Sequence, residues 1–95
     1  MNLVVAIIQN EDADAVAKAL VAGSHRLTRI NSAGGFFRRG NATLLIGVES
    51  AAVNDVVQII QANCRTRSAP NPPQDGLPMY SATVFVLDAS HFERI

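Results

Sequence analysis

The chain has 95 residues, enough for one small domain, and 48% of them are apolar while only 5% are aromatic, so we expect a core of Ala, Val, Ile and Leu. Eight basic residues balance eight acidic ones, which argues against the broad basic surface that nucleic-acid polymers require. The single Cys64 cannot form an internal disulfide, and no cysteine and histidine cluster has zinc-ligand spacing, so we expect a reducing compartment and neither metal nor cofactor.

The first predicted element is a strand at residues 3–8, which are β-branched or apolar on both faces. It lacks a basic leader and ends after one strand length, and the chain contains no apolar run of membrane length, so we expect a cytoplasmic protein without a membrane partner. A helix over residues 12–22 follows, with Asn10 or Asp12 as its cap and Gly23 as its end. Its apolar residues recur at helical spacing: Ala13, Val16, Ala17, Leu20 and Val21.

Two strands are predicted next, on either side of a glycine-rich turn. Residues 25–31 alternate in polarity, so Arg26 and Thr28 share one face of the first of these strands. Residues 42–48 form the second, strongly apolar strand. Its Gly47 leaves space that a ligand or a neighbouring chain could use.

The last predicted elements are a helix, a loop and a strand. Ser50 is a natural cap for the helix, whose expected buried stripe is Val53, Val56, Val57, Ile60 and Cys64. Residues 65–80 are rich in proline and predict a loop, because proline supports neither a helix interior nor a central strand. Residues 81–87 form the final strand.

This element order predicts an α+β fold. Strand, helix, strand, strand, helix, strand is the ferredoxin-like βαββαβ sandwich, an antiparallel sheet with two helices on one face. We interpret residues 1–95 as a single domain that includes the proline-rich loop. Val, Leu and Ile from several strands point to the other face of the sheet, which predicts self-association through that face.

The turn at residues 34–41 combines glycines, two aromatic side chains, two cations and an amide. Such a mixture suits an anionic, flat ligand, because glycine lets backbone N–H groups approach phosphate and a phenylalanine can stack on a base. A ligand site would bring together Arg26, Thr28, Gly35, Phe36 and Asn41. The alternative is structural: a hairpin connection, exposed strand residues, a phenylalanine in the core and an asparagine that caps a turn.

The sequence gives little support for catalysis. His25 and His91 have no serine, cysteine or carboxylate partner at a useful spacing. The acidic residues cluster at the start of the first helix and are otherwise scattered, without the paired carboxylates of a hydrolase. We therefore assign no catalytic residue.

Five segments together carry a resemblance to a known family: residues 5–9, 26–28, 34–43, 47–48 and 82–86. In combination they resemble the PII-like cyclic-di-AMP receptors of bacteria. The resemblance implies a homotrimer that binds cyclic di-AMP in clefts between subunits and acts as a signal receiver, not as an enzyme. The pattern covers nearly the whole chain apart from the proline-rich loop and is more specific than a lone glycine motif.

The resemblance also implies the residues of the site. Arg26 and Thr28 would lie beside the phosphates and ribose. The remaining positions would form the loop against adenine and the pocket floor: Gly35, Phe36, Phe37, Asn41 and Gly47. The chain departs from the family at Ser24, where asparagine is common, at Phe37, where leucine is usual, and in its shorter loop after Cys64.

The leading hypothesis is a PII-like trimer that binds cyclic di-AMP and relays its presence through loops to an unknown downstream protein. The main alternative is such a trimer that senses another ligand or serves as a protein-interaction scaffold. A more distant alternative is an acylphosphatase-like hydrolase, whose phosphate loop should follow the first strand. Residues 9–12 at that position are acidic and lack an arginine, so phosphate would be repelled there.

Overall fold

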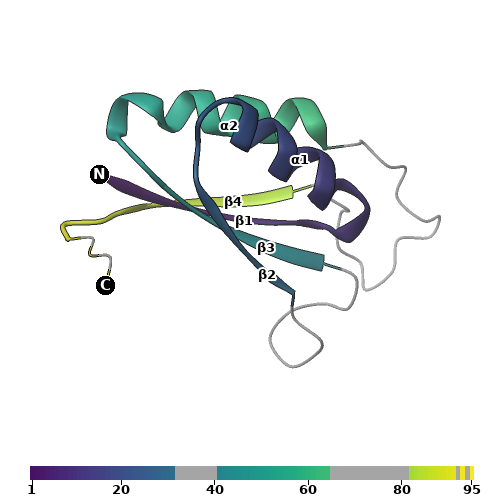
Figure 1. The fold of residues 1–95 in the computed structure, drawn as a ribbon, viewed down its shortest axis with the longest axis horizontal. Helices are drawn as coiled ribbons and strands as arrows, with labels where there is room; N and C mark the ends of the chain where they lie inside the picture. Colours follow the sequence, from purple (N-terminus) through teal and green to yellow (C-terminus); the bar gives the residue numbers. More distant parts are fainter. Residues whose placement is uncertain (32–40, 65–81, 92, 94) are drawn as a thin grey trace, which may run out of the picture.

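The structure, a computed structural model, describes residues 1–31, 41–64, 82–91, 93 and 95. Its helices and strands follow the predicted order (Figure 1). The elements are β1 (Asn2–Gln9), α1 (Asn10–Ala22), β2 (Leu27–Asn31), β3 (Asn41–Val48), the short 3-10 helix η1 (Ser50–Ala52), α2 (Val53–Asn63) and β4 (Ala82–Asp88).

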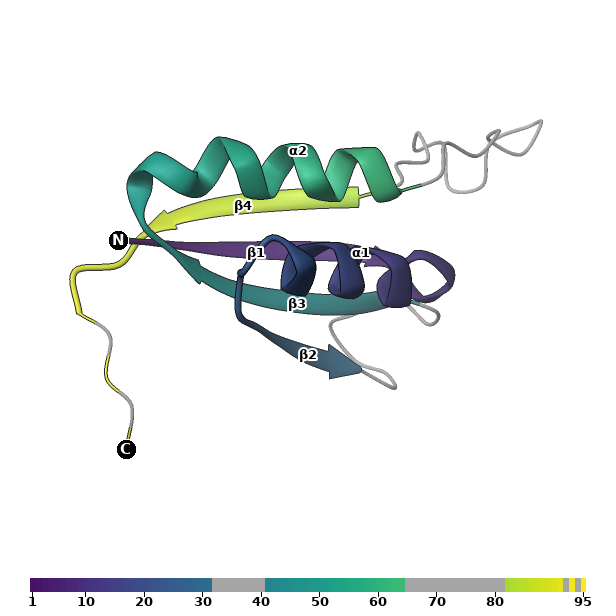
Figure 2. The ribbon, with the colours of Figure 1, turned by 45° about the horizontal axis from the view of Figure 1, so that its top comes forward.

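The four strands form one antiparallel sheet in the order β2-β3-β1-β4. Both helices lie on the same face of this sheet, as the two views in Figure 1 and Figure 2 show. This arrangement confirms the predicted α+β fold, a ferredoxin-like βαββαβ sandwich with two helices on one face. The register of the sheet decides which side chains face the helices and which face the opposite side.

The core lies between the sheet and the helices and is made of small and medium aliphatic side chains. Alternate residues of β1 and β3 point into it, and the buried faces of α1 and α2 cover them. The buried apolar residues are Val4, Ala6, Ile8, Ala13, Val16, Leu20, Ala42, Leu44, Ile46, Val48, Val56 and Ile60. Their small size allows the helices to pack closely on the strands.

Helix α1 begins two residues earlier than predicted and ends as predicted. It starts at Asn10 directly after β1, and Gln9 in its capping position makes no side-chain capping bond. Gly23 ends the helix, and its N–H donates to the Ala19 carbonyl at 3.1 Å. The left-handed residue is the next one, Ser24, with φ of 66°.

The predictions for β2 and Ser50 need correction. β2 starts at Leu27, so Arg26 precedes the strand instead of belonging to it. Ser50 does not cap α2: its hydroxyl donates to Asn2 Oδ1 at 2.7 Å, and η1 occupies residues 50–52 before α2 begins. A serine hydroxyl can either cap a helix or bond to another polar side chain. The sequence around Ser50 does not show that Asn2 of β1 lies nearby.

The sheet face opposite the helices carries apolar side chains that no described helix covers. Cross-strand pairing places Leu45, Val5 and Phe85 in one row on this face. The next row contains Leu3 and Leu87. Phe85 is 50% exposed and Leu87 is 49% exposed, so within the described residues this face remains open to a partner.

Candidate ligand-binding site

A groove opens at the edge of the sheet where β2 begins. The pairing of β2 with β3 starts at Leu27 and Ile46, while β3 continues for two more residues, Gly47 and Val48. Residues 23–26 connect the end of α1 to β2 and form no ladder pair with β3. The end of β3 is therefore uncovered on that side, and this difference in strand length creates the groove.

The groove has a volume of about 890 Å³, which lies within the range of small-molecule sites. Its walls come from the end of α1, the start of β2, the end of β3 and the turn that leads to α2. The lining residues are Met1, Leu3, Val21, Ser24, His25, Arg26, Leu27, Thr28, Leu45, Gly47, Val48, Glu49 and Ala52.

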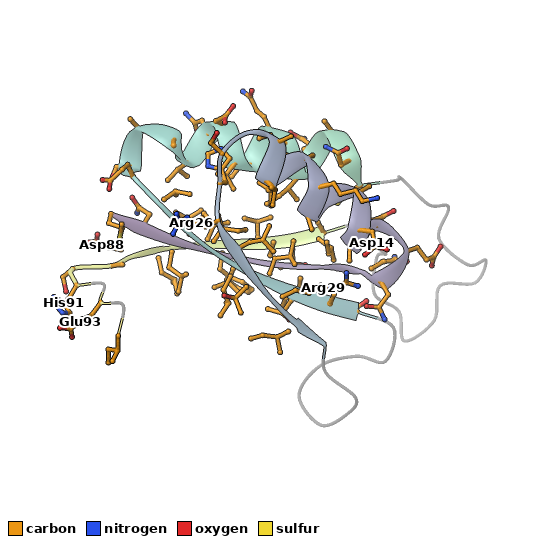
Figure 3. All side chains as sticks on the ribbon, in the orientation of Figure 1. Asp14, Arg26, Arg29, Asp88, His91 and Glu93 are labelled. Carbon is orange, nitrogen blue, oxygen red and sulfur yellow. The ribbon has the colours of Figure 1, made fainter. Side chains whose placement is uncertain are left out.

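Arg26 provides the permanent positive charge of this lining. Among the described residues no carboxylate forms an ion pair with Arg26, whereas the nearby Arg29 Nη1 lies 2.7 Å from Asp14 Oδ1. Figure 3 shows Arg29 beside Asp14, with Arg26 farther along towards the other end of the molecule. Within the described part of the chain, the Arg26 guanidinium can donate its hydrogen bonds to an anion in the groove.

Thr28 and Gly47 lie beside Arg26 on the same groove. Thr28 pairs with Leu45 across the β2–β3 ladder, so Gly47 is its diagonal neighbour at about 7–8 Å. Gly47 is exposed and has no side chain to fill the space above it. The structure thus brings three of the seven predicted site residues to one place.

Asn41 lies elsewhere in the same chain. It pairs with Gln9 at the start of β3, whereas Gly47 pairs with Leu3 near its end. They are six positions apart along the strand, a distance of about 20 Å. Both face the side of the sheet that the helices leave open, but Asn41 does not line the groove. One small ligand cannot contact Asn41 and Arg26 of the same chain through this groove.

The remaining three predicted site residues are Gly35, Phe36 and Phe37, and they lie outside the described residues. The same holds for Arg38, Arg39 and the proline-rich loop at 65–80. The described groove is therefore the part of the candidate site formed by the start of β2 and the end of β3.

His25 is a groove residue whose partner the sequence did not reveal. Its Nε2 lies 2.9 Å from Asp55 Oδ2 on α2, thirty positions away. We expected no carboxylate partner for His25, because local spacing offers none. Asp55 by itself does not indicate a contact with His25, because acidic residues are common in the first turn of a helix.

Two further lining residues were missed for different reasons. Val21 fits the apolar stripe of α1, yet it is 63% exposed and forms part of the groove wall. Glu49 lies between β3 and η1 and puts a carboxylate on the same groove as Arg26. The groove is therefore lined by one arginine and one glutamate, so an anionic ligand would be attracted by Arg26 and repelled by Glu49.

The fold leaves no loop where an acylphosphatase would need one. β1 ends at Gln9 and α1 begins at Asn10 without an intervening residue. Glu11 and Asp12 occupy the first turn of that helix, where their charge opposes a phosphate group.

Within the described residues no cluster of three or more His, Cys, Asp or Glu side chains could hold a metal, and no helix is long and apolar enough to cross a bilayer.

Comparison with known proteins identifies the family of the chain. The sequence model of the cyclic-di-AMP receptor family matches residues 1–95 of the chain. The chain belongs to the cyclic-di-AMP receptor family. The resemblance identified from the sequence is therefore confirmed, and the family is one of receptors and not of enzymes.

A solved structure of similar fold comes from Pediococcus pentosaceus ATCC 25745 and is described as a functionally unknown protein. It shares 33% sequence identity with this member of the cyclic-di-AMP receptor family, with a TM-score of 0.76. The match covers 99% of this chain and 96% of the other. The two proteins thus share their fold over almost their whole lengths.

Proposed function

We propose that this protein is a cytoplasmic homotrimer that binds cyclic di-AMP in clefts between adjacent subunits. Occupancy of the cleft rearranges loops that a downstream protein reads. The observation that supports the proposal most is the position of Arg26, which lines the groove beside Thr28 and Gly47 without an ion-pair partner among the described residues. Membership of the cyclic-di-AMP receptor family supplies the ligand class.

The chemistry of the groove suits a cyclic dinucleotide. The Arg26 guanidinium donates to a phosphate, and the Thr28 hydroxyl adds a donor or acceptor for the phosphate or ribose. Gly47 lets the ligand approach the β3 backbone closely. Gly35, Phe36 and Phe37 belong to the same proposed site and pack against adenine, where an aromatic ring stacks on a base.

A cleft between subunits accounts for Asn41. Asn41 and Gly47 lie at opposite ends of β3, so they contribute to one ligand site only if neighbouring chains supply different parts of it. The open sheet face supports self-association, because Phe85 and Leu87 are half exposed there and an apolar face of this kind needs a partner. Three such chains would form three equivalent clefts.

Isothermal titration tests the proposal directly. The parent protein should bind cyclic di-AMP more tightly than cyclic di-GMP or ATP. Arg26→Ala should weaken cyclic di-AMP binding about ten- to a hundredfold, since a charge-assisted hydrogen bond contributes about 1.5–3 kcal/mol. Arg29→Ala is the matched control, because Arg29 has the same charge and is paired with Asp14.

Three results would contradict the proposal in different ways. No heat with any of the three nucleotides would remove nucleotide sensing and favour a trimer that binds another ligand or a protein. Equal affinity of Arg26→Ala and the parent would remove the proposed site. A solution mass of one chain for the nucleotide-bound protein would remove the cleft between subunits.

A further inference from the structure

The contact between His25 and Asp55 joins the groove wall to α2. His25 Nε2 lies 2.9 Å from Asp55 Oδ2, and the His25 side chain is 11% exposed while that of Asp55 is 62% exposed. His25 lines the groove and directly precedes Arg26. The contact therefore links His25, which is next to Arg26, to helix α2.

Two further contacts hold His25 in place. Its backbone N–H donates to the Leu20 carbonyl at 2.9 Å, which fixes its main chain to the end of α1. Its ring packs near Gly23, where an added Cβ would lie 3.3 Å from His25 Cδ2 and 3.3 Å from Ile59 Cδ1. The imidazole is thus held between the two helices, with Asp55 as its polar partner.

Arg26 depends on its neighbours for its position. It lies outside β2, so the cross-strand pairing that begins at Leu27 does not include it. Its main chain is fixed by Leu27 on one side and by His25 on the other. A ligand-binding side chain needs such support, because a small displacement of its backbone moves the guanidinium away from the productive geometry.

We infer that Asp55 is a positioning residue that acts through His25 to hold Arg26 over the groove. The inference rests on the proposed function, in which Arg26 contacts a phosphate of the ligand. Asp55 itself does not line the groove. The same contact couples the site to α2, because a ligand that fixes Arg26 also favours the arrangement in which His25 meets Asp55.

The chain contains a matched control for this role. Asp14 pairs with Arg29 at 2.7 Å, with side-chain exposures of 79% and 31%. That contact also joins the segment after α1 to a helix, and the Asp14 side chain, like that of Asp55, is largely exposed. Arg29, however, belongs to β2 and pairs with Leu44, so the sheet fixes its backbone without the help of Asp14.

The first experiment needs no ligand. Amide hydrogen exchange is measured in the unliganded protein for the parent, Asp55→Ala and Asp14→Ala, with urea unfolding as the measure of global stability. Asp55→Ala should speed exchange of the His25 amide, which donates to the Leu20 carbonyl, about fivefold more than any change in global stability explains. Asp14→Ala should leave this amide unchanged. Unchanged exchange in Asp55→Ala would overturn the positioning role.

The second experiment is a double-mutant cycle on cyclic di-AMP affinity. Asp55→Ala should weaken binding about three- to tenfold when Arg26 is present and have no further effect in an Arg26→Ala background. Asp55→Asn, which keeps a hydrogen-bonding partner for the imidazole, should restore most of the affinity, and Asp14→Ala should bind like the parent. Equal losses in both backgrounds would mean that Asp55 acts on the fold in general and would overturn the inference.

The two experiments separate this inference from the proposed function. If the parent does not bind cyclic di-AMP, the proposed function is wrong, and the exchange measurement still decides whether Asp55 holds Arg26 in place. If the parent binds and exchange in Asp55→Ala is unchanged, the proposed function stands and the positioning role does not.

Discussion

Ser24, and not its neighbour Gly23, adopts the left-handed conformation at the end of α1: φ is 66° at Ser24 and −84° at Gly23. A glycine in the left-handed position after a helix is the common solution, because it has no Cβ to crowd the backbone. Here the glycine is placed one residue earlier. Position 24 therefore requires a residue that tolerates a positive φ, whereas position 23 requires a residue without a large side chain. Substitutions at the two positions test these requirements one at a time.

We expect Ser24→Gly to stabilise the protein by about 0.5–1 kcal/mol. Removal of the side chain relieves the left-handed strain, and the larger conformational entropy of the unfolded chain offsets part of that gain. The unfolding midpoint in urea measures the effect. Ser24→Val is the control and should destabilise the protein, because a β-branched side chain is poorly tolerated at this φ. A lower midpoint for Ser24→Gly would contradict the prediction.

Gly23→Ala should destabilise the protein by about 1 kcal/mol. The backbone there is ordinary for any residue, but the new Cβ would lie 3.3 Å from both His25 Cδ2 and Ile59 Cδ1. The ring cannot shift freely because Asp55 holds it. Urea unfolding gives the free-energy change. A midpoint equal to or above that of the parent would contradict the prediction, because relaxation of His25 and Ile59 would then cost no more than alanine gains by restricting the unfolded chain.

Glu49→Gln should strengthen cyclic di-AMP binding about two- to fivefold, because the Glu49 carboxylate repels the phosphates of the ligand across a solvent-exposed groove. The difference should shrink as salt is added, since screening weakens exposed charge interactions. Titration at two salt concentrations measures both effects. Glu93→Gln is the matched control in the C-terminal tail. Weaker binding of Glu49→Gln would mean that the carboxylate accepts a hydrogen bond from the ligand.

Phe85→Asp should dissociate the proposed homotrimer without unfolding the chain. Phe85 is 50% exposed on the open sheet face, so the aspartate places a charge in the proposed interface while the core stays intact. Val86→Asp is the control, because Val86 is 46% exposed on the other face of the same strand. Sedimentation gives the masses. A trimer that survives Phe85→Asp and is lost in Val86→Asp would place the interface elsewhere.

Periodicity and turn residues were sufficient to predict the fold. The apolar alternation of β1 and the helical spacing of Val16 and Leu20 are local signals, and the structure confirms the elements that they indicate. Ser50 was misassigned, because its hydroxyl has two favourable uses and the choice depends on Asn2, which is 48 positions away. Element ends were therefore harder to predict than the elements themselves.

The candidate site was predictable only in part, for a similar reason. Arg26 and Thr28, which residue chemistry grouped together, line one groove with Gly47, which the family resemblance added. Asn41, grouped with them on the same chemistry, lies at the other end of β3. The contact between His25 and Asp55 and the exposure of Val21 were not foreseen. Both depend on how α1 and α2 pack on the sheet, and this packing cannot be predicted from the spacing of neighbouring residues in the sequence.

The unequal lengths of β2 and β3 determine which main-chain groups the groove offers to a ligand. Successive residues of a strand direct their N–H and C=O groups to opposite edges. One of Gly47 and Val48 therefore offers both main-chain groups to the edge that β2 leaves uncovered. A ligand that uses them is held by main-chain atoms that a substitution by alanine does not remove, so alanine scanning of the groove would leave that part of the affinity intact.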